Sequence, residues 1–147
     1  MSITAWMLLG AFQDFEASSS GSTGSIRVLL CDDVPEFRAL LRLALEDDPG
    51  LVVVGETGDG RACVDCVLAQ RPDVLLLDLS MPDFDGLEAL PQIRAQAPDT
   101  AVVVLSGFSA SRMAEQVLAA GAAGYLEKGT SFEGIRAAVR AAAEGHR

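Results

Sequence analysis

The chain has few basic and few aromatic residues. It contains 11 Lys and Arg against 21 Asp and Glu, which gives a formal net charge of −10 at pH 7. A nucleic-acid surface needs clustered Lys and Arg to contact phosphates, so we expect no direct DNA binding by this chain. Aromatic residues make up 5% of the chain and hydrophobic residues 50%. The core must therefore consist largely of Ala, Val and Leu.

Cysteine and histidine are also scarce. The three cysteines show no paired framework of the kind found in small secreted proteins, which favours a reducing compartment and a cytoplasmic location. Cys63 and Cys66 have CxxC spacing, but they lie within an apolar helical pattern and no second ligand pair accompanies them. Packing is the favoured interpretation of this pair. The only histidine, His146, lies near the end of the chain.

The first 25 residues differ from the rest. The apolar run at residues 3–12 is too short to span a bilayer and no Lys or Arg precedes it, so we expect neither membrane insertion nor secretion. Apolar side chains within residues 1–16 recur at helical spacing, which predicts an amphipathic segment that docks on the folded domain or on a neighbouring copy. Such a segment would be a partner-derived or artificial peptide fused to the folded domain, and the alternative is vector-derived sequence that happens to be apolar. Residues 17–25 read as a Ser/Gly linker, and the folded domain is expected over residues 26–147.

From residue 26 onward, short apolar runs alternate with segments of helical spacing. The runs are Ile26–Cys31, Leu51–Glu56, Val74–Asp78, Ala101–Ser106 and Gly124–Glu127. Each has the composition of a strand, and each is followed by apolar residues at intervals of three and four, as in an amphipathic helix. This pattern predicts an α/β domain with a doubly wound, five-stranded parallel sheet and five crossover helices.

Polar residues mark the carboxyl ends of four of these strands, where ligands bind in such sheets. Asp32 and Asp33 follow the first strand and Asp78 ends the third, while Ser106 ends the fourth and Lys128 follows the fifth. Carboxylates this close together repel one another, so we expect a cation among them. Oxygen ligands favour Mg²⁺ or Mn²⁺ over zinc. Such a cation would neutralise an incoming phosphoryl group while the Asp78 carboxylate attacks it.

Four motifs together resemble the receiver domain of bacterial two-component response regulators. They are CDD (31–33), DLSMPDFDG (78–86), VLSG (104–107) and GYLEK (124–128). The resemblance extends from Ile26 to about Gly145 and is closest to the subgroup that carries a C-terminal LuxR-type helix-turn-helix. It implies a flavodoxin-like fold and a transcriptional output domain that is absent from this chain.

The resemblance also implies the chemistry of the site. Asp78 would accept a phosphoryl group from a histidine kinase or a phosphotransfer protein. Mg²⁺ (or Mn²⁺) would be held by Asp32, Asp33 and Asp78, with the backbone carbonyl of Ser80 completing the protein ligands. The chain would then act as a signalling module that catalyses its own phosphorylation and dephosphorylation, rather than as an enzyme with an external substrate.

Three further residues would respond to phosphorylation. Lys128 would pair with the phosphoryl oxygens, while Ser106 and Tyr125 would reorient toward the new group. Ser106 could instead cap the following helix, and Tyr125 could be a plain core residue. The expected result is a homodimer, formed either through the fourth helix and fifth strand or through the first and fifth helices.

Two other functions are weighed against this interpretation. A phosphatase of the haloacid dehalogenase type also uses an aspartyl nucleophile, but it needs a second Asp two residues further on, where this chain has Ser80. A receiver-like interaction domain that works without phosphate usually lacks one of the acids or the lysine, and this chain has all of them.

Two positions depart from the usual pattern of the family. Gly129 replaces the usual proline after Lys128, which argues against a cis peptide bond there. Pro91 is expected in the first turns of its helix, where a missing amide hydrogen matters little.

Overall fold

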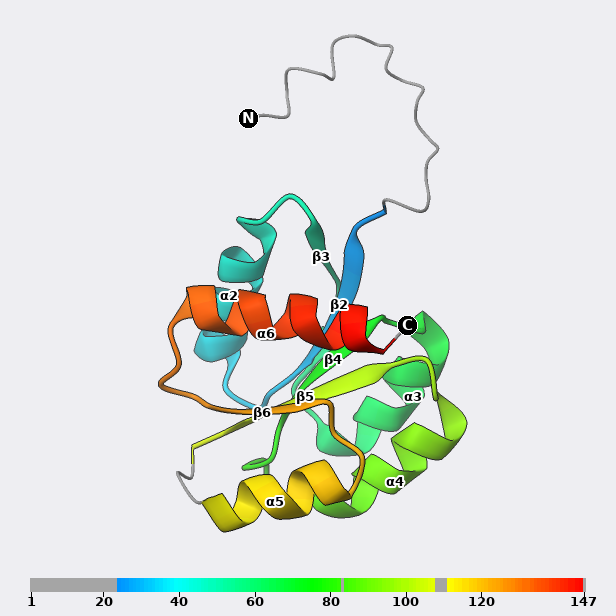
Figure 1. Cartoon of the computed structure of the whole chain (residues 1–147). Coiled ribbons are helices and arrows are strands. Elements are labelled where there is room, and N and C mark those ends of the chain that lie inside the picture. The colour runs from blue at the N-terminus through cyan, green and yellow to red at the C-terminus, as the bar shows by residue number, and fades with distance from the viewer. Residues whose placement is uncertain (1–23, 83, 108–110, 147) are drawn as a thin grey trace, which may run out of the picture.

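The computed structural model describes residues 24–82, 84–107 and 111–146 (Figure 1). The predicted amphipathic segment, residues 1–16, and most of the predicted linker lie outside the described residues. The first strand begins at Ile26, where we expected the folded domain to start. None of the helices in the described part is long and apolar enough to cross a membrane.

Five strands and five helices alternate along this part of the chain. The strands are β2 (Ile26–Cys31), β3 (Leu51–Thr57), β4 (Val74–Asp78), β5 (Ala101–Ser106) and β6 (Gly124–Glu127). The helices are α2 (Pro35–Glu46), α3 (Gly60–Gln70), α4 (Gly86–Gln96), α5 (Ser111–Ala119) and α6 (Phe132–Gly145). Four strands have the bounds expected from the sequence, and β3 continues one residue further, to Thr57.

The strands form one parallel sheet in the order β3-β2-β4-β5-β6. The chain runs outward from β2 to β3 and then returns to β4 on the other side of β2. The strand order therefore reverses between β2 and β4, and in sheets of this kind the ligand crevice lies at the carboxyl ends of the strands beside that point. The predicted doubly wound, flavodoxin-like architecture is confirmed.

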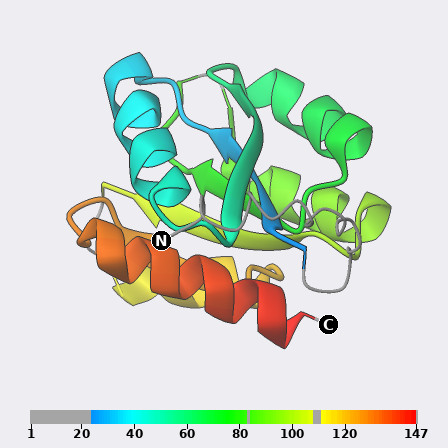
Figure 2. The same cartoon turned by 90° about the horizontal axis from the view of Figure 1, so that it is seen from above.

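Helices cover both faces of the sheet (Figure 2). Val28 and Leu30 of β2 belong to the core cluster that includes residues of α2 and α6. The alternate residues Leu29 and Cys31 belong to the second cluster, which includes residues of α3, α4 and α5. Successive side chains of a strand point to opposite faces, so a strand buried on both sides must be apolar at every position. Cys63 is fully buried in the second cluster, as the packing interpretation requires.

Local signals set the starts of the helices that surround the site. The Asp85 carboxylate caps α4 by accepting hydrogen bonds from the amides of Leu87 and Glu88. Helix α2 begins on Pro35, whose missing amide hydrogen is not needed there.

The expectation that the missing amide hydrogen of Pro91 would matter little was wrong. Pro91 is the sixth residue of α4, beyond the four amides that lack intrahelical partners, so the Leu87 carbonyl receives no bond from it. No cis peptide bond occurs among the described residues, Lys128–Gly129 included.

Candidate functional site

The carboxyl edge of the sheet brings the predicted polar residues together. Asp32 follows β2, Asp78 ends β4 and Ser106 ends β5, and these three residues are 2%, 1% and 0% exposed. Lys128 follows β6, with about a quarter of its side chain exposed. Buried polar groups at the ends of otherwise apolar strands require polar or ionic partners. The site provides these partners from its own residues.

Three carboxylates form a cluster that could hold a metal ion. One oxygen from each of Asp32, Asp33 and Asp78 lies within 4.8 Å of the others. Oδ1 of Asp32 accepts the amide of Val34 at 2.9 Å. The other oxygen, Oδ2, is buried without a well-aligned hydrogen bond, although the Lys128 ammonium lies 3.0 Å away. A buried carboxylate oxygen with spare acceptor capacity, beside two further carboxylates, fits a hard cation such as Mg²⁺.

Asp78 lies between a backbone amide and a side-chain ammonium. Its Oδ1 accepts the amide of Ser80 at 2.8 Å, and its Oδ2 lies 3.2 Å from Nζ of Lys128. Burial raises the pKa of this carboxyl, and the nearby charge of Asp32 raises it further, against the lowering effects of Ser80 and Lys128. The anion is therefore incompletely stabilised by the protein alone. The Ser80 amide orients Asp78, and the role of the Ser80 carbonyl as a metal ligand stays a prediction.

Lys128, the only lysine of the chain, contacts both buried acids. Burial acts to lower its pKa, but hydrogen bonds and charge from Asp32 and Asp78 outweigh this effect and raise it. The side chain therefore stays protonated at neutral pH and offsets part of the negative charge of the cluster. Its backbone amide donates to the carbonyl of Ser106 at 2.9 Å, which ties the loop after β6 to the end of β5.

The two predicted switch residues lie on the neighbouring strands β5 and β6. Ser106 is the last residue of β5, whereas α5 begins at Ser111, so Ser106 does not occupy the capping position of that helix. Tyr125 pairs with Val104 across the sheet, is partly buried, and packs against the second core cluster. This position is compatible with a core role or a switch role, and the switch role of both residues stays a prediction.

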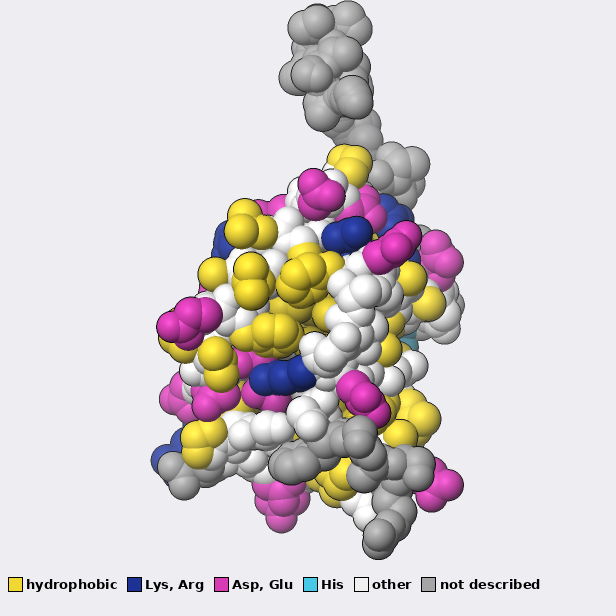
Figure 3. All heavy atoms as spheres, turned by 90° about the vertical axis from the view of Figure 1, so that its left-hand side faces the viewer, with side chains coloured by type: hydrophobic (Ala, Val, Ile, Leu, Met, Phe, Trp, Pro, Cys, Tyr) yellow, Lys and Arg dark blue, Asp and Glu magenta, His cyan; other side chains and the backbone are white. Residues whose placement is uncertain are grey.

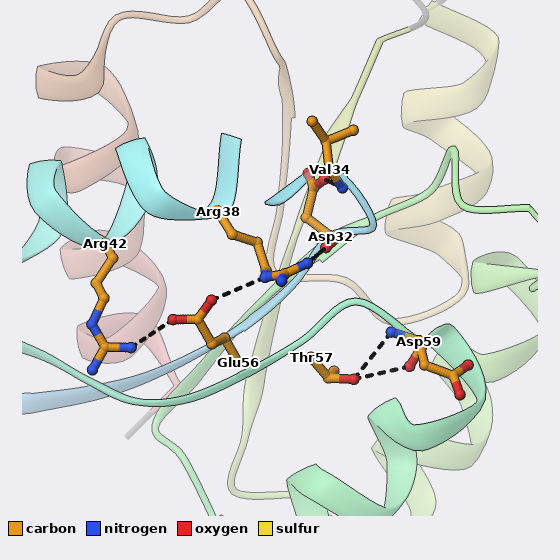
Figure 4. Close-up of polar contacts among 7 residues, drawn as sticks. All are labelled: Asp32, Val34, Arg38, Arg42, Glu56, Thr57 and Asp59. Atoms are coloured by element: carbon orange, nitrogen blue, oxygen red, sulfur yellow. Dashed lines mark hydrogen bonds and ion pairs between the residues drawn. The ribbon is translucent and has the colours of Figure 1, made fainter. Parts of the chain in front are cut away.

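Sequence reasoning missed Arg38, the basic residue that contacts Asp32, and the ion pairs around it (Figure 4). Nη1 of Arg38 donates to the backbone carbonyl of Asp32 at 2.6 Å, and Nε of Arg38 contacts Glu56 at 2.9 Å. The second oxygen of Glu56 accepts Nη1 of Arg42 at 2.6 Å. The four-residue spacing of Arg38 and Arg42 places them on one side of α2, but nothing in the sequence relates either to residue 56.

The comparisons with known proteins agree with this geometry. The family model of the response regulator receiver domain matches residues 28–140. The transcriptional regulatory protein LiaR of Bacillus subtilis is 40% identical over 120 residues, covering 82% of this chain and 57% of LiaR. The chain thus spans little more than half the length of this relative.

Two solved structures share the fold and part of the sequence. The signal receiver domain of the response regulator NarL from Mycobacterium tuberculosis has a TM-score of 0.79 and 36% identity, and the match covers 83% of this chain and 98% of that one. A response regulator from Burkholderia pseudomallei, solved with a phosphorylated aspartic acid, has a TM-score of 0.70 and 26% identity over 81% of this chain and 69% of that one. The chain therefore belongs to the receiver domain family of two-component response regulators.

Proposed function

We propose that Asp78 is the phosphoacceptor, with a histidine kinase or a phosphotransfer protein as the donor. The observation that carries the proposal is the position of Asp78, a buried carboxylate at the end of the central strand, clustered with two other acids and 3.2 Å from the only lysine. The phosphorylated aspartic acid of the Burkholderia structure supports the same chemistry in a relative. Asp32, Asp33 and Asp78, with the carbonyl of Ser80, would hold Mg²⁺ or Mn²⁺.

The transfer is an in-line displacement. One carboxylate oxygen of Asp78 forms the new O–P bond while the P–N bond of the donor phosphohistidine breaks, and the electron pair of that bond stays on the imidazole nitrogen. A bound divalent cation would neutralise charge on the transferring group. Lys128 would then exchange part of its contact with the carboxylates for the phosphoryl oxygens.

The same residues argue against the other two functions. An interaction domain without phosphate has no use for three clustered acids and a partly buried lysine, whose mutual contacts would be simpler to replace with apolar packing. Ser80 contributes its amide to Asp78 and offers no carboxyl group to act as the general acid of a hydrolase. We therefore propose no hydrolytic activity toward an external phosphoester.

The output of the whole protein depends on segments beyond this chain. LiaR is a transcriptional regulator, and this chain spans a little over half its length. By analogy, we place the control of transcription in an output domain, with the receiver acting in the cytoplasm and binding no DNA directly. Phosphorylation would bias Ser106 and Tyr125 toward a second arrangement and promote a homodimer.

Residues 1–16 have a separate proposed role as a docking segment. Four of the exposed large hydrophobic residues in the described part lie on or beside α2 and at the start of α6, namely Val34, Leu40, Leu43 and Phe132. Figure 3 looks onto this side of the molecule and shows hydrophobic side chains gathered there. A pocket between α2 and α6, lined in part by Leu40, Leu43 and Phe132, would receive the apolar side of residues 1–16, from the same chain or from a neighbouring copy.

Labelling with a small acyl phosphate, followed by mass spectrometry, tests the phosphoacceptor. The wild-type chain should gain one phosphoryl group on Asp78 in the presence of Mg²⁺, and none in EDTA. Asp78→Asn should abolish the label, whereas Asp65→Asn, the same change on the exposed side of α3, should not. Label that persists on Asp78→Asn, or that forms equally well in EDTA, would contradict the proposal.

A further inference from the structure

Almost all polar groups of Asp32 form hydrogen bonds with residues outside the metal cluster. Its amide donates to the carbonyl of Thr57 at 3.1 Å, and its Oδ1 accepts the amide of Val34 at 2.9 Å. Its backbone carbonyl accepts Nη1 of Arg38 at 2.6 Å. Only Oδ2 is left to face Lys128 and the other acids. The peptide that joins Asp32 to Asp33 therefore has a fixed orientation, and Arg38 supplies one of its contacts.

Arg38 is itself held from two sides (Figure 4). Its guanidinium joins the Asp32 carbonyl at the end of β2 to the carboxylate of Glu56 on β3, and Arg42 holds the second oxygen of that carboxylate. Hydrogen bonds from Arg38 and Arg42 lower the pKa of Glu56, so the acceptor stays charged at neutral pH. The planar guanidinium can make both contacts at once, which a single ammonium group cannot do with the same geometry.

Gly58 leaves the space that the guanidinium occupies. A Cβ at this position would lie 2.6 Å from Nη1 of Arg38 and 3.6 Å from the carbonyl oxygen of Asp32. The turn after β3 thus packs directly against the contact between these two residues. A side chain at residue 58 would displace the guanidinium without changing any charge, which provides an independent way to break the contact.

We propose that Arg38 is a positioning residue for the metal site, which holds the Asp32–Asp33 peptide so that both carboxylates face one cation. The inference rests on the proposed metal-dependent function. The proposal also predicts the opposite of what the charge of Arg38 alone would do to Mg²⁺ affinity. A nearby positive charge repels Mg²⁺, so losing it should strengthen cation binding unless the residue also organises the ligands. The direction in which Mg²⁺ affinity changes when Arg38 is replaced therefore distinguishes a positioning role from an effect of charge alone.

Magnesium titration of the whole chain by calorimetry is the first test. Arg38→Gln and Gly58→Ala should each weaken Mg²⁺ binding by about tenfold, the scale on which supporting contacts to metal ligands act. Arg42→Gln is the matched control, because it removes the same charge from the same cluster and leaves the contact of Arg38 with Asp32 in place. It should leave Mg²⁺ affinity unchanged or higher. Unchanged or tighter binding in Arg38→Gln would overturn the proposal.

Amide hydrogen exchange without metal is the second test. Loss of the Arg38 contact should speed exchange of the Val34 amide, which is bonded to Asp32, several-fold more than exchange of Leu76 in the central strand. The Leu76 amide reports overall unfolding and corrects for any loss of stability. Equal increases in the exchange rates of both amides would mean that Arg38 contributes only to overall stability, and would refute the proposal. If the wild-type chain bound no Mg²⁺, the proposed function would be wrong, but the exchange comparison would still decide whether Arg38 holds this loop.

Discussion

The ammonium group of Lys128 lies 4.8 Å from the centre of the Phe37 ring. Phe37 is on α2 and packs partly buried against the first core cluster, while Lys128 lies in the loop after β6. A cation over an aromatic face is attracted by the ring quadrupole. The contact therefore helps to aim the only lysine of the chain at Asp32 and Asp78, and it links α2 to the loop that leads into α6.

Lys128→Ala should separate metal binding from the response to phosphate. The variant would lose the proposed charge partner of the phosphoryl oxygens but none of the proposed metal ligands, so calorimetry should show Mg²⁺ affinity that is retained or higher. The chemical-shift changes caused by beryllofluoride, a phosphoryl mimic, should be much reduced. Arg61→Ala removes one positive charge from the exposed start of α3 and should change neither measurement. A tenfold loss of Mg²⁺ affinity in Lys128→Ala, taking about 1.4 kcal/mol as tenfold, would contradict the assignment.

The ion pair between Asp48 and Arg140 should make stability depend on pH in acid. Two contacts of 2.9 and 2.6 Å join these side chains, and the hydrogen bond from Arg140 lowers the pKa of Asp48 below its ordinary value of 3.8. The folded-state pKa then lies below the unfolded-state pKa, so the unfolded chain binds more protons in that interval. The contribution of the pair is present above pH 3.8 and is lost as the pH falls through the lower, folded-state value.

Denaturant unfolding of Asp48→Asn across this pH range measures the effect. Because the pair is partly exposed, we expect the variant to be less stable at neutral pH by up to about 1 kcal/mol. The difference from wild type should shrink in acid. Asp47→Asn, the same change at the neighbouring exposed residue, serves as the control. If the difference between Asp48→Asn and wild type grew as the pH fell, the pKa of Asp48 would be raised by folding rather than lowered.

Leu76→Ala should test how far the central strand supports the site. Leu76 is 1% exposed in β4, two residues before Asp78, and the substitution should lower the free energy of unfolding by about 2 to 5 kcal/mol through lost burial and an unfilled cavity. Leu43→Ala makes the same change at a side chain that is 71% exposed, and should cost no more than about 0.5 kcal/mol. Equal losses in urea unfolding would show that the core is not organised around β4.

Deletion of Met1 to Thr23 should leave phosphorylation of Asp78 intact. Among the described residues, those that form the acidic cluster and its lysine contact all lie after Ser25, so labelling by acyl phosphate should match that of the full chain. Oligomeric state or solubility should change, because the apolar segment and its proposed pocket between α2 and α6 are no longer joined. Loss of labelling would mean that the segment belongs to the site and would exclude the docking role.

Phosphorylation should convert the chain to a homodimer. Sedimentation velocity with and without beryllofluoride measures this, and the mass should double when the mimic and Mg²⁺ are both present. Leu43→Glu would place a charge on the exposed face of α2, and Leu118→Glu on the exposed face of α5. The variant that prevents the dimer identifies which of the two expected faces is used. An unchanged mass at high protein concentration would contradict dimer formation.

The sequence by itself determined the elements and the type of site. Strands such as Val74–Asp78 must be apolar at every position when helices cover both faces, so their pattern and their polar ends are visible along the chain. Parallel strands also bring their carboxyl ends to one edge, which is why Asp32, Asp78 and Lys128 could be predicted to converge. The motifs around these residues were specific enough to indicate the family, which the comparisons confirm.

Only the tertiary structure decided how these residues are held. The order of the strands, the contact of Lys128 with Phe37 and the bond from Arg38 to the Asp32 carbonyl leave no periodic signal. Arg140 and Asp48 are 92 positions apart and meet only because α6 packs beside α2. Burial of an apolar face constrains every third or fourth residue, whereas a polar contact constrains one atom of a long, flexible side chain. Such a contact depends on where the folded backbone places its partner, and an isolated sequence does not encode that position in any local pattern.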